Sequence, residues 1–316
     1  MTLEASHVDN GFPVVVEEKA ASLPSWYQER RAWVEQQLLA SGAVLFRGFG
    51  VEDQAAFSAL AKALSDRLLP YVAGNSPRKS LGSGVYTSTE YPAKYRISLH
   101  NEMSYEASWP MKLAFCCVVP PESGGETPIG DSRAILRNLP GPAVDEFRKR
   151  GVKYVRTLHG GRGAGSSWQD TFQRQDRAQV ETAHRDSYSE FEWTADGGLR
   201  IASIRPAIAT HPVTGEDVWF NQAEQFHPSA LGKEVWAALM TIHGGREERL
   251  PQNALFGDGT PIDVSMLDDI RRVMNEQTVM FPWRKGDVLL LDNMLACHGR
   301  MPYQGPRKIL VAMASG

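Results

Sequence analysis

The segment SLHNEMSY, residues 98–105, places His100 and Glu102 two residues apart in a stretch that is typical of a β-strand. Residues i and i+2 of a strand face the same side, so both side chains can converge on one point. Two histidines and one carboxylate form the ligand set of non-haem Fe(II) oxygenases. The pair alone is weak evidence, because polar residues commonly alternate on half-exposed strands. A metal site here requires another histidine from a distant part of the chain.

Among the eight histidines, His298 is the best candidate for that third ligand. It follows DVLLLDNML, the most apolar predicted strand, and precedes a turn. An ordinary strand-end histidine held by a hydrogen bond is the alternative. His211 lies in a turn beside Pro212 and Gly215, which favours a structural role. The chain has no His-Glu-Xaa-Xaa-His motif, so the common zinc-protease arrangement is excluded.

Two further residues carry groups that suit a small carboxylate. Arg307 follows His298 across the turn GRMPYQGP, and a hairpin there would fold it back beside the metal ligand. A guanidinium can bind a carboxylate through two parallel hydrogen bonds, which a lysine cannot match. Thr127 lies in GGETPIG, where its hydroxyl could donate to the same carboxylate. Each residue alone is more simply a surface arginine or a turn threonine.

The fold that these segments predict is mainly β with flanking helices, closed like a jelly roll. Strands lie on both sides of the helical material, and there is no alternation of strand and helix typical of a parallel sheet. Residues 72–94 and 159–168 are rich in Gly and Ser and are expected to form long loops. The expected helices are 23–42, 51–66, 231–243 and 265–276, and the expected strands are 43–49, 94–102, 111–119, two segments within 199–222, 286–300 and 307–314.

Composition narrows the class of protein. The chain has 316 residues and 42% hydrophobic content, which suffices for one barrel-like domain over residues 1–316, although length alone would suggest two. A net charge of -3 favours neither nucleic acid nor an anionic membrane as partner. The N-terminus lacks the features of a signal peptide, and no apolar run is long enough for a membrane span. Three cysteines fit a reducing compartment, so we expect a cytoplasmic protein.

The motifs gain weight from their order. They run HNE at 100–102, GGETP at 124–128, THPVTG at 210–215, and CHGR followed by PRKIL within 297–310. Together they resemble the taurine dioxygenase/TfdA family of Fe(II)- and 2-oxoglutarate-dependent oxygenases over roughly residues 95–312. The segments HNEMSY, GGETPIGDSR, VWFNQ and DNMLACHGRMPYQGPRK are most similar to its SyrP-like branch, which has Glu where taurine dioxygenase has Asp.

This resemblance implies a double-stranded β-helix with iron in its mouth. His100, Glu102 and His298 would hold Fe(II), and Arg307 and Thr127 would bind the distal carboxylate of 2-oxoglutarate. The enzyme would use O2 to hydroxylate an unactivated carbon, with release of succinate and CO2. The SyrP-like branch implies an amino acid substrate, free or on a carrier protein, in natural product biosynthesis. The loops at 72–94 and 159–170 would close over the substrate.

Three departures and ambiguities refine this expectation. Taurine dioxygenase has a second arginine four residues after its carboxylate-binding arginine, and here that position is Val311, which argues against a sulfonate substrate. The local alignment leaves Arg307 and Lys308 one residue apart, and we prefer Arg307 for its fork geometry. Related halogenases lose the carboxylate ligand so that chloride can bind. The retained Glu102 therefore favours oxygen transfer.

Substrate contacts are predicted from strand alternation and proximity. Arg96 and Ser98 share the face of His100, and Tyr105 and Asn221 lie in or near the matched motifs; surface exposure or core packing is the alternative for each. The same cofactors could also serve desaturation, epoxidation or cyclisation. A metal-binding jelly roll that does not use 2-oxoglutarate, and a metal-free binding protein, are the other readings. The sequence leaves a homo-oligomer open.

Overall fold

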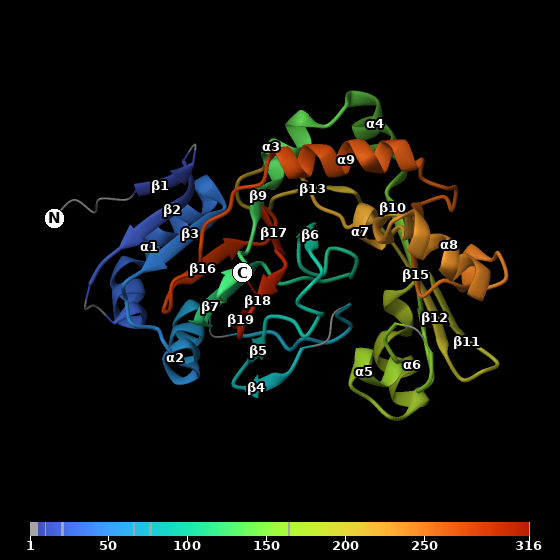
Figure 1. Ribbon diagram of the computed structural model, residues 1–316, viewed down its shortest axis with the longest axis horizontal. Coiled ribbons are helices and arrows are strands. Elements are labelled where there is room, and N and C mark those ends of the chain that lie inside the picture. The colour runs from blue at the N-terminus through green and yellow to red at the C-terminus, as the bar shows by residue number, and fades with distance from the viewer. Residues whose placement is uncertain are drawn as a thin grey trace.

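The largest sheet occupies the left half of the view in Figure 1. The computed structural model describes residues 11–19, 22–65, 67–75, 78–163 and 165–315, and the backbone alone of 6–9. Within them the sheet has eight strands in the order β1-β2-β3-β16-β7-β19-β5-β4. The strands are β1 (Ser6–Asp9), β2 (Phe12–Glu17), β3 (Ala43–Arg47), β16 (Val288–Asp292), β7 (Lys112–Val119), β19 (Lys308–Ala314), β5 (Val85–Thr87) and β4 (Ser80–Gly82).

Two helices cover one face of this sheet. The first, α1 (Leu23–Ser41), ends at Gly42, whose φ of 85° is readily available only to glycine and whose N–H bonds to the Leu38 carbonyl. The second, α2 (Gln54–Leu64), begins after Asp53, whose side chain accepts from the Ala56 N–H. Helix α1 joins β2 to β3, which lie parallel. The expectation of no strand–helix–strand unit is therefore wrong at this one place.

The opposite face of the sheet packs against a smaller sheet of three strands, β6 (Ile97–His100), β17 (Ala296–Arg300) and β9 (Ile129–Asp131). Leu113 and Phe115 of β7 belong to the core between the two sheets, whereas Ala114 and Cys116 face the helices. Cys116 and Cys117 therefore point to opposite faces of the sheet, and both are buried. His100 and His298 lie in the smaller sheet.

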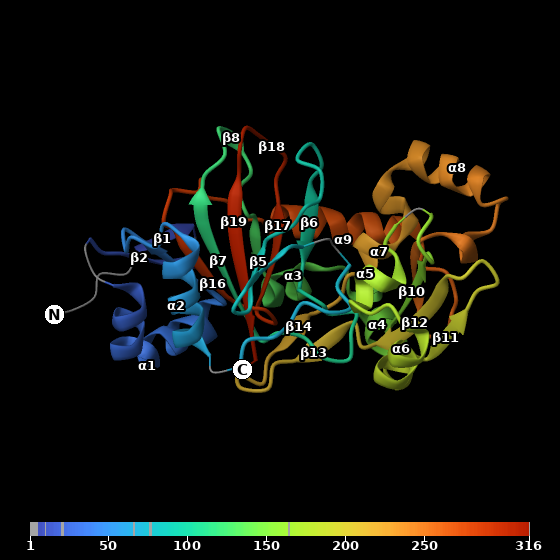
Figure 2. The same cartoon turned by 90° about the horizontal axis from the view of Figure 1, so that it is seen from below.

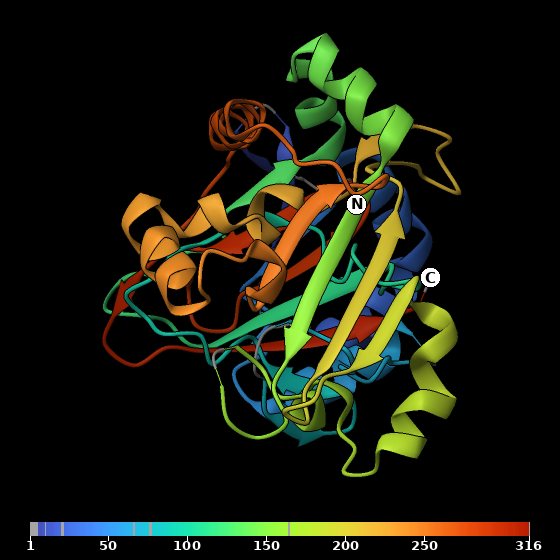
Figure 3. The ribbon, with the colours of Figure 1, turned by 90° about the vertical axis from the view of Figure 1, so that its right-hand side faces the viewer.

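A separate four-stranded sheet lies at the far end from α1 and α2, as Figures 2 and 3 show. Its order is β11 (Glu190–Trp193), β12 (Leu199–Arg205), β10 (Val152–Leu158) and β15 (Gln252–Phe256). Two-stranded pairs are β13 (Ile208–Thr210) with β14 (Asp217–Trp219), and β18 (Tyr303–Gln304) with β8 (Ser123–Gly124). Apart from β2 with β3, the paired strands of the described residues are antiparallel.

The remaining helices lie along the outside of these sheets. They are α3 (Ser132–Asn138), α4 (Gly141–Arg150), α5 (Trp168–Phe172), α6 (Arg177–His184), α7 (Ala223–Phe226), α8 (Lys233–Ile242) and α9 (Val264–Glu276), with 3-10 turns at Arg185–Ser187, Pro228–Leu231 and Glu247–Arg249. None of the helices in the described residues is long and apolar enough to cross a membrane. The predicted mainly β architecture with flanking helices is confirmed.

Three details differ from the sequence expectations. The segment 72–94 contains the hairpin of β4 and β5, and β5 joins the main sheet through β19. Strand β6 ends at His100, so Glu102 lies in the turn that follows. Strands β17 and β19 belong to different sheets and do not form the expected hairpin. The last two differences concern Glu102 and Arg307. Both residues reach the site through other contacts than those expected from the sequence.

Candidate metal centre and active site

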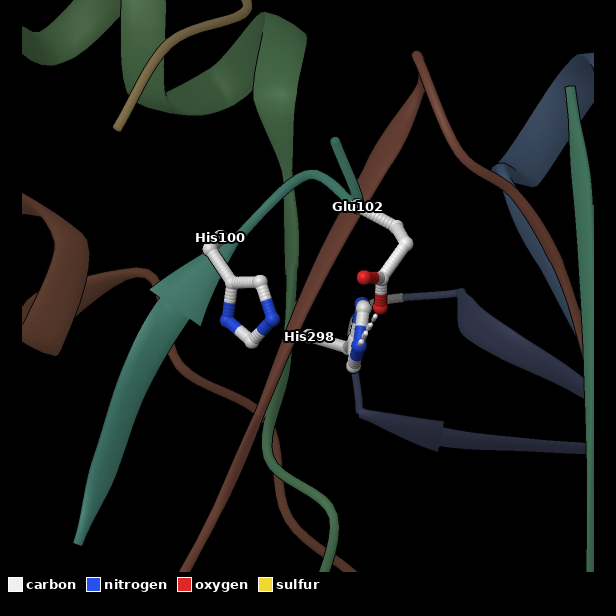
Figure 4. A group of neighbouring side chains, drawn as sticks. All are labelled: His100, Glu102 and His298. Atoms are coloured by element: carbon white, nitrogen blue, oxygen red, sulfur yellow. Dashed lines mark ion pairs between the residues drawn. The ribbon is translucent and has the colours of Figure 1, made fainter. Parts of the chain in front are cut away.

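Two neighbouring strands bring the histidines together. In the pairing of β17 with β6, His298 lies directly opposite His100, and the ring centroids are 4.4 Å apart. Glu102 reaches the same point from the turn after β6, and its Oε2 lies 3.7 Å from Nε2 of His298. Figure 4 shows the three side chains pointing toward one another. One candidate ligand atom from each lies within 4.8 Å of the others, which is compatible with a single shared metal ion.

Glu102 lies outside strand β6, and a buried network of side-chain amides holds it in place. The Asn293 side chain accepts from the Glu102 N–H at 2.7 Å and donates to the Glu102 carbonyl at 2.9 Å. The side chain of Asn101 donates to the Asn293 carbonyl, and Gln222 donates to the Asn101 carbonyl. Met103 follows with a φ of 58°. Sequence reasoning missed Asn293, although its place directly after the apolar strand β16 was a signal.

The surroundings of both imidazoles suit metal binding. Nδ1 of His100 lies 2.9 Å from the Ser98 carbonyl and donates to it, so Nε2 is the ring nitrogen left for a metal. Burial, with the nearby His100 and Arg78, lowers the pKa of His298 well below its usual value, so this ring is neutral. Nδ1 of His298 is buried and has no hydrogen-bond partner among the described residues. Two imidazoles and a carboxylate form the donor set that Fe(II) takes in facial triads.

Arg307 is a half-buried cation that forms no ion pair with a carboxylate among the described residues. It directly precedes β19, and its Nε donates to the Gly125 carbonyl at 2.9 Å. Burial and then the charge of Arg300 lower its pKa to about 10, which still leaves it charged at neutral pH. Near it, Trp283 Nε1 donates to the Thr127 hydroxyl oxygen at 3.2 Å, so the hydroxyl hydrogen can be donated elsewhere. The pair is suited to receive a carboxylate.

A cavity of about 280 Å³ joins the triad to Arg307 and Thr127. Three of the four predicted substrate residues line it: Arg96, Ser98 and Tyr105. Arg96 is exposed, and its guanidinium donates to Asn275 at 2.6 Å. The fourth, Asn221, is buried away from the cavity, and its side chain bonds to the backbone at Ala207 and Ala223. The structure thus gives Asn221 a supporting role and does not place it against a substrate.

Sequence reasoning also missed Arg78, which lines the cavity from the segment expected to be a loop. Its Nη2 lies 2.6 Å from Glu102 Oε2, and its guanidinium carbon lies 4.3 Å from the centre of the Tyr71 ring. The neutral side chains of Asn75 and Gln252 form another part of the wall and bond to each other at 3.0 Å. A basic residue in a Gly- and Ser-rich segment was the one available signal for Arg78.

A mainly β fold that places two histidines, a carboxylate and a half-buried arginine around one cavity defines a class of protein, the non-haem Fe(II)- and 2-oxoglutarate-dependent oxygenases. Residues 9–313 match the model of the family described as "Taurine catabolism dioxygenase TauD, TfdA family". The chain belongs to this family. It is a dioxygenase that uses Fe(II), 2-oxoglutarate and O2.

Two relatives and one solved structure add detail. The dapdiamide synthesis protein DdaC of Enterobacter agglomerans is 37% identical over 89% of this chain and 84% of its own length. A clavaminate synthase-like protein of Arabidopsis thaliana is 32% identical over 96% of this chain and 93% of its own. The crystal structure of AAD-2 with Mn(II) and N-oxalylglycine matches 100% of this chain and 98% of its own with a TM-score of 0.58 at 14% identity, and this likeness shows the fold.

Proposed function

We propose that this dioxygenase hydroxylates an unactivated carbon of an amino acid or of a carrier-bound aminoacyl group in natural product biosynthesis. Succinate and CO2 would be the co-products of 2-oxoglutarate. The printed name of DdaC, a dapdiamide synthesis protein, supports a role in making a natural product. The retained Glu102 favours oxygen transfer over halogenation, because it leaves one coordination position fewer for chloride.

The observation that carries the proposal is the convergence of three candidate ligands and a half-buried arginine on one cavity. His100, Glu102 and His298 would hold Fe(II), which supplies the oxidising chemistry when O2 and 2-oxoglutarate are bound. Arg307 would take the distal carboxylate of 2-oxoglutarate through two hydrogen bonds, with a third from the Thr127 hydroxyl. Partial burial would strengthen these contacts, because fewer water molecules compete for either partner.

The same proposal covers the architecture around the site. The main sheet and the three-stranded sheet would be the two halves of a double-stranded β-helix, in one domain over the whole chain. Residues 72–94 would act as a lid, since Asn75, Arg78, Ser88, Thr89 and Tyr91 line the cavity. The lid over 159–170 has less support, because none of its described residues lines the cavity.

Substrate-dependent succinate release tests the proposal. The purified protein, supplied with Fe(II), 2-oxoglutarate and air, is expected to release succinate faster with some member of an amino acid panel than without substrate. His298→Ala should abolish this release, because one of three metal ligands is lost. His243→Ala, the same substitution at the end of α8 and outside the cavity lining, should retain it. Equal release by both variants would contradict the ligand assignment.

Desaturation, epoxidation or cyclisation would use the same residues and cofactors. The outcome depends on which substrate carbon lies nearest the metal and on what can leave from the neighbouring atom. Product masses from the panel separate these reactions into two groups, because hydroxylation and epoxidation add one oxygen, whereas desaturation and oxidative cyclisation remove two hydrogens. A metal site that does not use 2-oxoglutarate would show no succinate at all.

A further inference from the structure

Arg78 has an environment that none of the functions proposed so far explains. Its side chain is only 4% exposed, stacks on the Tyr71 ring and ends beside Glu102 in the cavity. It lies two residues before β4, and Asn75, a few residues earlier in the chain, also lines the cavity. A buried arginine is costly to place here unless its charge and its donors are used.

Most donors of this guanidinium are not used by the described residues. Nη2 bonds to Glu102, but Nε and Nη1 are buried and have no hydrogen-bond partner. An unsatisfied buried donor on a charged group is more costly than one on a neutral group. Arginine presents five N–H hydrogens in a planar fork, which is complementary to the two oxygens of a carboxylate. The unpaired N–H groups of Arg78 therefore indicate that a carboxylate binds in the cavity.

The charges around the cavity support an anionic ligand. Among the described residues, its lining contains four arginines, 78, 96, 300 and 307, and one acidic residue, Glu102. Arg300 donates to the backbone carbonyls of residues 91, 92 and 95, and Arg96 bonds to a neutral amide. If Glu102 binds a divalent cation, as proposed above, then Arg78 loses most of the counter-charge that the described residues give it. The distal carboxylate of 2-oxoglutarate would compensate Arg307 and leave Arg78 unmatched.

We propose that Arg78 is a second carboxylate receptor of this cavity, separate from Arg307, and that it binds a carboxylate of the substrate beside the metal ligands. This inference rests on the proposed function and narrows its substrate class to carboxylic acids. The near carboxylate of 2-oxoglutarate offers the same chemistry and is the other possible source. Cation stacking on Tyr71 and the ion pair with Glu102 hold the guanidinium in position before the substrate arrives.

Calorimetric titration of a non-reactive complex tests the inference. The protein is loaded with Mn(II) and saturated with N-oxalylglycine, a non-reactive analogue of 2-oxoglutarate, and titrated with each L-amino acid and its carboxamide. Wild type is expected to bind at least one acid about tenfold or more tightly than the matching amide. Arg78→Gln should erase this preference, and Arg78→Lys should keep part of it. Lys79→Gln removes a neighbouring exposed charge and should behave as wild type.

A titration with N-oxalylglycine itself distinguishes the two sources. If the substrate supplies the carboxylate, Arg78→Gln should change the affinity of the Mn(II) protein for N-oxalylglycine by less than about twofold. A loss of about tenfold there would keep the receptor but assign it to the near carboxylate of 2-oxoglutarate. Melting curves of all variants establish that they are folded.

Two results would overturn the inference. In the first, wild type binds no acid more tightly than the matching amide, and Arg78→Gln leaves the affinity for N-oxalylglycine unchanged. In the second, Arg78→Gln has the same affinities as wild type in both titrations. Either result leaves the proposed function standing as long as wild type binds N-oxalylglycine with Mn(II). Failure of wild type to bind N-oxalylglycine would instead contradict the proposed function.

Discussion

At the residue scale, Arg307 is the side chain that we propose as the receptor for 2-oxoglutarate. It is charged, half-buried and without an ion-pair partner among the described residues, so an incoming carboxylate would complete its environment. Arg307→Ala is expected to weaken 2-oxoglutarate binding by about tenfold or more, since charge-assisted bonds are lost. Arg307→Lys should recover only part, because an ammonium cannot form the bidentate pair. Anaerobic titration of the Fe(II) protein with 2-oxoglutarate measures both, and unchanged affinity in Arg307→Ala would rule out the clamp.

Asn293 is the second residue-scale test, because it contacts the backbone of Glu102 and no ligand atom. Asn293→Ala should weaken metal binding about 10- to 100-fold, as is usual when a residue that orients a ligand is removed. Metal affinity is measured by competition with a chelator. Asn138→Ala, at the exposed end of α3, serves as the control for loss of an asparagine amide. Equal metal affinity in both variants would show that Asn293 does not position Glu102.

Sequence patterns predicted three residues that the structure brings together, but partly for the wrong reason. The i and i+2 rule placed Glu102 on the face of His100, yet β6 ends at His100 and Glu102 converges through a turn fixed by Asn293. Such a turn depends on a side chain almost two hundred residues away in the chain, and no local pattern reports it. Arg78 was missed for the same reason, since only the folded chain brings it to Glu102.

At the element scale, the segment after the Glu102 turn is held by a buried polar cluster. Tyr188 donates to both carboxylate oxygens of Glu106, at 3.1 and 3.2 Å, and Arg156 lies 3.7 Å from the same carboxylate. Arg156 also donates to the carbonyls of Ala73 and Gly74, so the cluster links the segment to the proposed lid. Burial, opposed by Arg156, raises the pKa of Glu106 to about 7.

This raised pKa predicts how stability depends on pH. The folded state retains the proton of Glu106 above the pKa of the unfolded chain, about 4.3, so unfolding releases a proton between these values. The contribution of Glu106 to the free energy of unfolding should therefore fall as pH rises from about 4.3 to about 7, by about 4 kcal/mol. Glu106→Gln should flatten this slope, whereas the exposed Glu122→Gln should not. Denaturant melts at several pH values measure this dependence. If the free energy of unfolding of Glu106→Gln depends on pH as steeply as that of wild type, Glu106 does not have a raised pKa.

Element prediction succeeded where the local signals were strong. The helix expected at 23–42 is α1, ended by Gly42 as expected, and the helix expected at 265–276 is α9. The suggested hairpin of the last two strands does not form, because β17 and β19 belong to different sheets. Which strands pair depends on the packing of the whole core, so it could not be predicted from their adjacency in sequence. Arg307 nevertheless reaches the same cavity as His298, through the contact of the two sheets.

At the scale of the whole molecule, the site lies where the main sheet faces the three-stranded sheet. Phe115 of the main sheet packs 5.0 Å from the His298 ring, which keeps the inner side of the site apolar. The four-stranded sheet contributes Gln252, and described residues of the segment 72–94, among them Asn75 and Arg78, line another part of the cavity. The cavity is therefore built from parts of the chain that are far apart in sequence, which is why the ordered motifs predicted the class of enzyme better than the details of its pocket.

The most direct test of this account is the visible charge-transfer absorption of the anaerobic protein with Fe(II) and 2-oxoglutarate. Chelation of iron by the keto acid within the triad produces a weak visible band that neither component shows alone. We expect the band in wild type, its loss in His298→Ala, and a higher 2-oxoglutarate concentration for its half-maximal appearance in Arg307→Ala. Folded wild-type protein that shows no band at saturating Fe(II) and 2-oxoglutarate would contradict the central claim.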